Sequence, residues 1–394
     1  MQDKFYLTEK LPPYIFAEIY RLKKEAIAKG LDIIDFGMGN PDSAPPQNVM
    51  DKLSELVKNP NLFGYSPTGG LEVLKQAICN YYQRNFNVEL DYQNEALITI
   101  GAKEGIASLA TAIADKDNYI CVPSPSYPIH TFAFIIAKAN VKFIEAIKPN
   151  EFLQKFKEFV NKSEKKPQAV IVSYPCNPTT EIVELGFYQE LVDFCKYHQI
   201  YIISDIAYCE LYFNESDKPH SILEVKGAKE IAIEFSSVSK SYSMAGTRIG
   251  FAVGNKNLIS ALYKIKSYLD YGSFSPLQMV AVEALSESSD NYLQELRKKY
   301  QQRGEFFIKT YQEILGWKIN QPKASMFIWT PLPQEARDLP SFEFCKKLIQ
   351  EAGVAISPGS SFGSNGEGFI RFSMIHNQDK IVESAERIAK ILKK

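Results

Sequence analysis

The chain reads IAIEFSSVSKSYSMAGTRIGFAV over residues 231–253. Its two ends, 231–235 and 249–253, are short apolar runs of the kind that form buried strands. Between them lies a stretch rich in hydroxyl groups that contains Lys240 and Arg248. Two charged residues on a solvated surface loop are the common explanation of such a stretch. A lysine among hydroxyls at the end of a buried strand is also suited to react with a carbonyl group, so the segment alone leaves both interpretations open.

Short apolar runs alternate with longer helical patterns from about residue 96 onward. This alternation predicts βα units and a mostly parallel sheet. We expect seven strands, at residues 97–100, 119–122, 141–144, 169–173, 200–204, 231–235 and 249–253. Ligands of such sheets gather at the carboxyl ends of the strands.

After residue 254 the pattern changes to long amphipathic helices, followed by two strand-like runs, 325–330 and 368–373, with a helix between them. A chain of 394 residues exceeds what one hydrophobic core usually fills. We therefore predict an α/β fold with a large domain, whose mostly parallel sheet lies between helices, and a smaller α+β domain. The predicted boundaries are 1–45 for an N-terminal arm that joins the small domain, 46–285 for the large domain and 286–394 for the small domain.

Composition argues against several classes of protein. The formal net charge is -1 and acidic and basic residues are interspersed, so we expect no nucleic-acid partner. No run approaches the length of a membrane helix, and residues 1–10 lack the apolar core of a secretory signal. The six cysteines include no CxxC pair and the four histidines show no metal-ligand spacing, which favours a cytoplasmic protein without a metal. We interpret each histidine, His130 included, as a surface or packing residue.

A phosphate site is indicated by the sequence GAKEG, which stands between the first predicted strand and a helix. Backbone N–H groups at a helix start bind anions, so Ala102 and Lys103 are candidates. Taken alone, this motif is more often an ordinary turn of small residues between a strand and a helix. The hydroxyl and guanidinium donors that a phosphate monoester requires are supplied by Ser237, Ser239 and Arg248.

The cofactor is suggested by residues that follow other strands. Asp205 ends a predicted buried strand, where its carboxylate needs a cationic partner. The protonated ring nitrogen of pyridoxal phosphate would be such a partner, and the ion pair would let the ring accept electrons. Asn177 and Tyr208 could donate hydrogen bonds to the phenolic oxygen of the ring. Lys240 would form an imine with the aldehyde of the cofactor. Each motif occurs freely by chance, and its weight comes from its place after a strand.

Two further residues are candidates for the same site. Tyr127 follows another strand and could stack on the pyridine ring, although a tyrosine packed in a core or turn is an equal alternative. Arg371, in the run 368–373, would bind a substrate carboxylate bidentately if its two neighbours face the core. An arginine exposed at a sheet edge is the alternative.

With Asn177, Asp205, Lys240, Arg248 and Arg371 in this order along the chain, nearly the whole chain resembles the fold-type I, pyridoxal phosphate-dependent aminotransferases of class I/II. The resemblance implies that Lys240 forms the imine and serves as general base, and that Asp205 contacts the pyridinium. It assigns the phenolic oxygen to Asn177 and Tyr208, and the ring face to Tyr127. It assigns the phosphate to Ala102, Lys103, Ser237 and Arg248, and the substrate carboxylate to Arg371 and Asn177.

The resemblance also implies an assembly. Tyr65 matches the family tyrosine that reaches the phosphate of the neighbouring subunit, which implies a homodimer with shared active sites. Gly39 follows an apolar strand in a glycine-rich run, where the backbone can closely approach a ligand, and is a further candidate for substrate binding.

Within the family, residues 11–14, 34–42, 265–272 and 322–329 look most like bacterial glutamate–pyruvate (alanine) aminotransferases. They are also similar to a branch of aspartate, methionine and LL-diaminopimelate aminotransferases. No second arginine is evident for a distal carboxylate, and Lys103 is a candidate for that role. The expected reaction moves an amino group between an L-amino acid and a 2-oxo acid by ping-pong chemistry.

Other functions remain as alternatives. A pyridoxal phosphate-dependent C–S β-lyase shares this fold and the same lysine. A transcription regulator with an aminotransferase-like domain would need an additional DNA-binding domain of roughly 60 residues, whereas about thirty residues precede the first strand here. A nicotinamide-dependent oxidoreductase would need a GxGxxG motif after the first strand, and the sequence has none.

Overall fold

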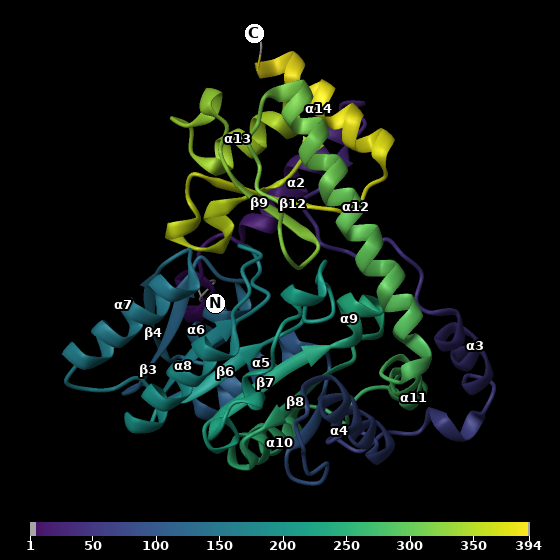
Figure 1. Cartoon of the computed structure of the whole chain (residues 1–394), viewed down its shortest axis with the longest axis vertical. Coiled ribbons are helices and arrows are strands. Elements are labelled where there is room, and N and C mark those ends of the chain that lie inside the picture. The colour runs from purple at the N-terminus through teal and green to yellow at the C-terminus, as the bar shows by residue number, and fades with distance from the viewer. Residues whose placement is uncertain (1–4, 393–394) are drawn as a thin grey trace. The chain divides into compact units, whose positions relative to one another are not determined.

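The computed structural model describes residues 5–392, and the chain within it divides into two compact units (Figure 1). The larger unit comprises residues 40–299 and 323–325, and the smaller unit comprises the other described residues. Residues 1–4, part of the segment inspected above for a secretory signal, lie outside the description. The domain boundaries expected from the sequence stay a prediction.

A seven-stranded sheet forms the centre of the larger unit. Its strands lie in the order β2-β8-β7-β6-β5-β3-β4. Their bounds are β2 Ala96–Thr99, β3 Tyr119–Ser124, β4 Asn140–Glu145, β5 Ala169–Ser173, β6 Tyr201–Asp205, β7 Ala232–Ser237 and β8 Gly250–Gly254. All seven expected strands are therefore confirmed, each to within two residues at either end.

One strand of this sheet runs against the others. β8 pairs antiparallel with β2 and with β7, whereas the pairs among β3 to β7 are parallel. The mostly parallel sheet is confirmed, and the reversal has a consequence for the site. The amino end of β8 lies at the same edge of the sheet as the carboxyl ends of its neighbours, because Gly250 pairs with both Thr99 and Ser237.

Helices cover both faces of the sheet (Figure 1), and strands β2 and β5 to β8 are almost entirely buried, whereas the edge strand β4 is largely exposed. Helices α5 (Ala102–Ile113), α6 (Ile129–Ile136) and α10 (Lys256–Leu269) contribute to the apolar cluster on one face. Helices α4 (Glu72–Phe86), α7 (Pro149–Lys162), α8 (Leu185–Tyr197) and α11 (Ser275–Ala284) contribute to the cluster on the other face. The remaining helices of the larger unit are α3 (Gln47–Leu56) and the single turn α9 (Val238–Ser241).

The smaller unit is built on two small sheets. In one, β1 (Ile34–Asp35) pairs parallel with β10 (Val354–Ala355), which joins the N-terminal segment to the C-terminal part of the chain. In the other, β12 (Phe369–Ser373) lies between β11 (Ser357–Pro358) and β9 (Phe327–Pro331). Its helices are α1 (Tyr6–Lys10), α2 (Ile15–Ala28), α13 (Ser341–Lys347) and α14 (Gln378–Leu392).

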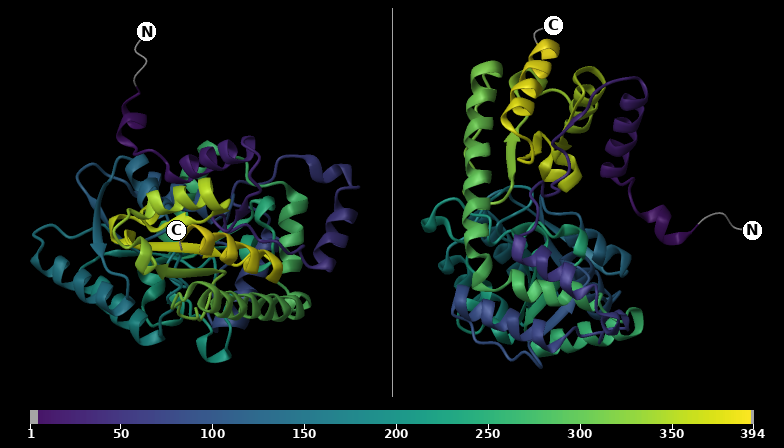
Figure 2. Two further views of the ribbon diagram at one scale, coloured as in Figure 1. Left: turned by 90° about the horizontal axis from the view of Figure 1, so that it is seen from above. Right: turned by 90° about the vertical axis from the view of Figure 1, so that its right-hand side faces the viewer.

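Helix α12 (Asp290–Leu315) is one continuous helix that contributes residues to both units (Figure 2). Within the smaller unit it lies beside α14, and Tyr311 and Ser384 join the two helices through a hydrogen bond of 2.8 Å between their hydroxyls. Among the described residues, none of the helices is long and apolar enough to cross a membrane.

Candidate active site

The Lys240 segment is the connection of an antiparallel strand pair. Ser237 ends β7, and its hydroxyl accepts a hydrogen bond from the backbone N–H of Ser239 at 3.3 Å, which caps the short helix α9. Lys240 lies half-buried within α9. The chain then returns to β8 after Arg248, whose backbone adopts the left-handed region with a φ of +57°. Lys240 and Arg248 are therefore held at one edge of the sheet.

Arg248 lies against the start of α5. Its Nη2 is 3.4 Å from the carbonyl oxygen of Ile100 and its Nη1 donates to the carbonyl of Ala245 at 2.9 Å. A Cβ atom on Gly101 would lie 2.2 Å from Nη2 of Arg248, and one on Gly250 would lie 2.5 Å from the backbone nitrogen of Ala102. Only glycine at these two positions allows the guanidinium and β8 to approach the helix start so closely.

The donors assembled at this edge suit a phosphate monoester. The amino end of α5 supplies backbone N–H groups, Ser237 and Ser239 supply hydroxyls, and Arg248 supplies a guanidinium. The structure thus brings together most of the residues that the sequence predicts for the phosphate. Ala102 is half-buried at the start of α5, and the side chain of Lys103 is exposed.

Asp205 ends β6 and is buried with 6% of its surface exposed. Its Oδ2 is 2.9 Å from Nε2 of His130, and its Oδ1 accepts a hydrogen bond from the backbone N–H of Ala207 at 3.1 Å. The carboxylate is therefore oriented by two groups of the protein. Such a carboxylate can pair with a protonated ring nitrogen without rearranging.

His130 is the site residue that the sequence analysis missed. It is fully buried in the first turn of α6, so a surface position is wrong, and its hydrogen bond to Asp205 gives it a role beyond packing. Among the described residues, the structure shows no hydrogen-bond partner for its Nδ1. The sequence could have indicated His130 through its position three residues after Tyr127, shortly after the end of strand β3. The rings of Tyr127 and His130 meet edge to face, with centroids 6.0 Å apart.

Asn177 and Tyr208 lie in the loops that follow two neighbouring strands, because Ser173 at the end of β5 pairs with Asp205 at the end of β6. The amide Nδ2 of Asn177 donates to the hydroxyl of Tyr208 at 3.3 Å, and both residues are buried. The structure therefore brings this predicted pair into contact. Burial raises the pKa of the adjacent Cys176 thiol to about 11, so this cysteine stays protonated near neutral pH and is no nucleophile.

Arg371 and Gly39 belong to the smaller unit. Arg371 is only 4% exposed, so the alternative of an edge arginine in solvent is wrong. Its Nη2 donates to the carbonyl of Gly37 at 2.8 Å, and its guanidinium lies 4.1 Å from the ring centroid of Phe327. A Cβ atom on Gly39 would lie 2.6 Å from the same ring, so the backbone at Gly39 packs closely against Phe327, and its expected contact with a substrate stays a prediction.

Tyr65 takes a different position from the other candidates of the larger unit. Its side chain is 89% exposed, and its ring lies 4.9 Å from that of Tyr271, centroid to centroid. The segment around it is well anchored, because Ser66 donates to the carbonyls of Tyr271 and Ser273. Tyr65 is thus presented outward from a fixed backbone.

This fold and this arrangement of donors suit a pyridoxal phosphate-dependent transferase, and comparison with known proteins identifies the class. The chain belongs to the family described as aminotransferase class I and II, whose model matches residues 31–388. It is an aminotransferase that acts on amino acids and 2-oxo acids and depends on pyridoxal phosphate.

Several relatives match over nearly their whole length. The chain is 41% identical to the glutamate-pyruvate aminotransferase AlaC of Escherichia coli, over 98% of this chain and 93% of that protein. It is 40% identical to a putative aminotransferase AatC of Rhizobium meliloti, over 99% and 96%. It is also 40% identical to an LL-diaminopimelate aminotransferase of Maridesulfovibrio salexigens, over 97% of both chains. Among solved structures, substrate-bound BacF from Bacillus subtilis matches with a TM-score of 0.91 and 31% identity, over 99% of this chain and 98% of that chain.

Proposed function

We propose that the chain catalyses amino transfer between alanine and 2-oxoglutarate, with Lys240 as the residue that carries the cofactor. The observation that supports this site most directly is the buried carboxylate of Asp205, oriented by His130, one strand away from the strand that leads into Lys240. When bound, pyridoxal phosphate supplies an aldehyde that links to amines and a ring that accepts electrons from the substrate Cα.

The residues of the chain then have separate tasks. Lys240 would anchor the cofactor through its amine and, once that amine is free, would serve as the base that moves the proton of the substrate Cα. Asp205 balances the positive charge of the ring nitrogen, with His130 holding its carboxylate in place. Asn177 and Tyr208 donate hydrogen bonds to the ring oxygen, and the helix start at Ala102 with Arg248 holds the phosphate.

Substrate recognition is assigned to Arg371, Asn177 and Gly39. The buried guanidinium of Arg371 already has fixed neighbours, which prepares it to bind an α-carboxylate bidentately. Lys103, exposed at the start of α5, is the candidate for the distal carboxylate of glutamate. The relative AlaC favours the glutamate–pyruvate pair, and the diaminopimelate relatives keep that substrate as the second candidate.

We further propose a homodimer in which Tyr65 reaches the phosphate of the neighbouring active site. The exposed rings of Phe63, Tyr65, Tyr271 and Phe274 form one aromatic patch on the larger unit. A contiguous exposed apolar patch of this kind marks an association surface. A cytoplasmic location is supported by the six free thiols.

Absorbance spectroscopy and product analysis test this function. The purified protein should show a visible cofactor band that bleaches when an amino donor is added without an oxo acid. Alanine with 2-oxoglutarate should give pyruvate and glutamate faster than aspartate, methionine or LL-diaminopimelate as donors. Release of ammonia and pyruvate from a thioether amino acid would instead identify a β-lyase. A preference for LL-diaminopimelate as the donor would replace alanine as the proposed substrate.

A further inference from the structure

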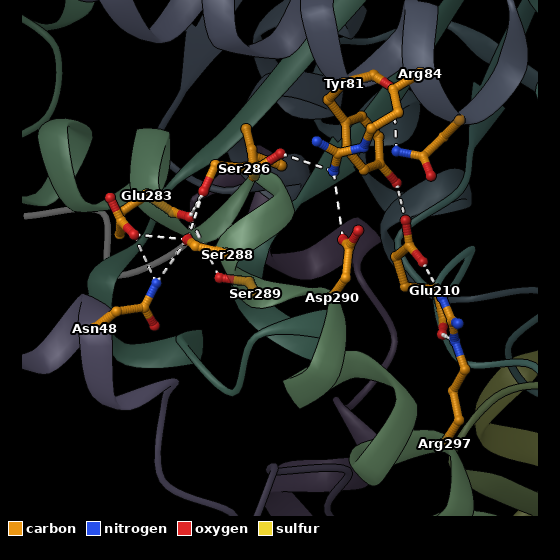
Figure 3. A network of polar contacts seen from close by, with 12 residues as sticks. Asn48, Tyr81, Arg84, Glu210, Glu283, Ser286, Ser288, Ser289, Asp290 and Arg297 are labelled. Atoms are coloured by element: carbon orange, nitrogen blue, oxygen red, sulfur yellow. Dashed lines mark hydrogen bonds and ion pairs between the residues drawn. The ribbon is translucent and has the colours of Figure 1, made fainter.

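Arg297, which is partly buried, and the buried Glu210 form a clamp of hydrogen bonds and an ion pair (Figure 3). Arg297 belongs to α12, and its Nε donates to the backbone carbonyl of Glu210 at 2.7 Å while its Nη2 is ion-paired with Oε2. On the other side, the hydroxyl of Tyr81 in α4 donates to Oε1 of Glu210 at 2.5 Å. Both carboxylate oxygens and the backbone of Glu210 are therefore held by two helices.

The energetics of this clamp depend on Arg297. Glu210 is only 4% exposed, and a buried carboxylate without a cationic partner is strongly destabilising. The guanidinium also lies 3.9 Å from the ring centroid of Tyr212, a cation–π contact that fixes its plane. A lysine could supply the charge at this position, but its single nitrogen cannot reproduce the fixed planar spacing of Nε and Nη2, which bond the carbonyl and the carboxylate.

The clamp acts on a short segment that carries two predicted cofactor contacts. Asp205 begins this segment and Tyr208 lies two residues before Glu210. The backbone makes two tight turns in this segment. The N–H of Cys209 donates to the carbonyl of Ile206, and the N–H of Leu211 donates to the carbonyl of Tyr208, each at 2.9 Å. Glu210 sits inside the second turn, so a shift of its backbone would be transmitted to Tyr208 through this turn.

The same helix also contacts the Lys240 segment. The hydroxyl of Tyr292, in the first turn of α12, donates to the hydroxyl of Ser243 at 2.7 Å. Ser243 follows Lys240 by three residues and has a left-handed backbone with a φ of +53°. Helix α12 is thus hydrogen-bonded both to the segment that contains Tyr208 and to the segment that contains Lys240. It therefore helps to fix the distance between these two segments.

We propose that Arg297 is a positioning residue, which acts through Glu210 to hold the Tyr208 hydroxyl at the phenolic oxygen of the bound cofactor. This inference rests on the proposed function, because it assigns Tyr208 to that oxygen. Arg297 itself touches neither substrate nor cofactor in this assignment. Its loss therefore changes the electronic state of the linked cofactor without removing any group that binds it.

Titration of the visible absorbance band measures this effect directly. In Arg297→Met, the apparent pKa of the band of Lys240-linked cofactor should rise by about 0.5 to 1 unit, because a hydrogen bond to the deprotonated ring oxygen is weakened. Tyr208→Phe should raise it by at least as much, and adding Arg297→Met to Tyr208→Phe should raise it no further. Lys298→Met, which removes an exposed charge from the adjacent position of α12, is the matched control and should titrate like the wild type.

A second variant covers the possibility that Arg297→Met does not fold. Glu210→Gln combined with Arg297→Met leaves no unpaired buried charge and removes the same clamp. Its apo form should unfold in urea with normal cooperativity, while its cofactor band keeps the raised pKa. Arg297→Lys should fall between the wild type and Arg297→Met.

The outcomes separate the two proposals. If both clamp variants show the cofactor band with the same apparent pKa as the wild type, the role of Arg297 is overturned and the aminotransferase function still stands. A wild-type protein that shows no cofactor band would contradict the proposed function itself. Additive shifts in Arg297→Met and Tyr208→Phe would also overturn the inference, because the arginine would then act independently of Tyr208.

Discussion

The imidazole Nε2 of His130 lies 2.9 Å from the carboxylate Oδ2 of Asp205, and both side chains are buried. The two residues come from different elements, His130 from the first turn of α6 and Asp205 from the end of β6. In an apolar surrounding, a carboxylate keeps its charge and orientation only when hydrogen bonds satisfy its oxygens. This contact therefore prepares Asp205 for a cationic ring.

Replacement of the histidine tests that preparation. His130→Phe leaves Oδ2 of Asp205 without its donor, which costs roughly 1.5 to 3 kcal/mol, or about ten- to a hundredfold in the Kd of the cofactor. Titration of the apo protein with pyridoxal phosphate, followed by fluorescence, measures the change. His198→Asn, at the end of α8, should bind like the wild type, and equal affinity in His130→Phe would show that the hydrogen bond does not prepare the site.

Lys240 is expected to be essential for turnover but not for cofactor binding. Lys240→Ala keeps the phosphate donors and Asp205, so the protein should bind pyridoxal phosphate reversibly and lose transamination. Absorbance spectra and a single-turnover assay with alanine provide the measurement. Retention of wild-type turnover in this variant would exclude Lys240 as the base.

Mixed dimers test the predicted sharing of active sites. Tyr65→Ala and Lys240→Ala are each expected to be nearly inactive as homodimers. A hybrid of the two subunits contains one site with both intact residues, so refolding the mixture should restore about a quarter of the wild-type activity if association is random. Failure to regain activity in a mixture shown to contain hybrids would place Tyr65 in the active site of its own chain.

Lys266 forms a buried ionic cluster that no motif in the sequence indicated. Its fully buried Nζ lies 3.1 Å from Oε2 of Glu104 in the first turn of α5 and 2.8 Å from Oδ2 of Asp270. Lys266→Met leaves two carboxylates without their cation, which is expected to cost about 3 to 5 kcal/mol of unfolding free energy. Urea denaturation measures the unfolding free energy of this variant, with Lys264→Met, at an exposed position on the same helix, as the control. Equal stability of the two variants would show that the buried ion pairs of Lys266 do not stabilise the fold.

Glu234 should make stability depend on pH. Burial raises its pKa to about 7, although hydrogen bonds from Ser221, Ser204, Tyr82 and the N–H of Ile222 act in the opposite direction. The folded protein then holds a proton that the unfolded chain has released, so stability is highest below the ordinary glutamate pKa and falls as the pH rises through about 7.

A glutamine at this position removes the titration. In Glu234→Gln, the decline of roughly 3 kcal/mol expected between pH 4.5 and 7 should disappear. Urea midpoints at a series of pH values measure it, with Glu89→Gln as the exposed control. A decline of equal size in the wild type and in Glu234→Gln would assign the pH dependence to other groups.

Local pattern was enough to predict the strands and several residues of the site. The apolar runs that form β2 and β5 to β8 are buried on both faces, as their composition indicates, whereas β4 at the sheet edge is largely exposed. Asp205, Asn177 and the Lys240 segment could be found because each follows such a run. Their spatial neighbourhood then follows from the parallel pairing of β5, β6 and β7.

Other features depend on partners that are distant in the sequence. The direction of β8 depends on its pairing with β2, which the composition of β8 does not indicate. Lys266 has the appearance of an exposed helix lysine until Glu104, 162 residues earlier, is placed beside it. The importance of His130 likewise appears only when Asp205, 75 residues later, is in position.

The reversed direction of β8 also bears on how the protein folds. The parallel pairs of the sheet need long crossover connections, whereas β7 and β8 are joined by a connection of only 12 residues between Ser237 and Gly250. Short loops close with less loss of chain entropy than long ones and tend to form early. We expect the strand pair that carries Lys240 and Arg248 to be among the first parts of the sheet to assemble, so that the anchoring amine and the phosphate-binding guanidinium acquire their spacing before the rest of the site exists.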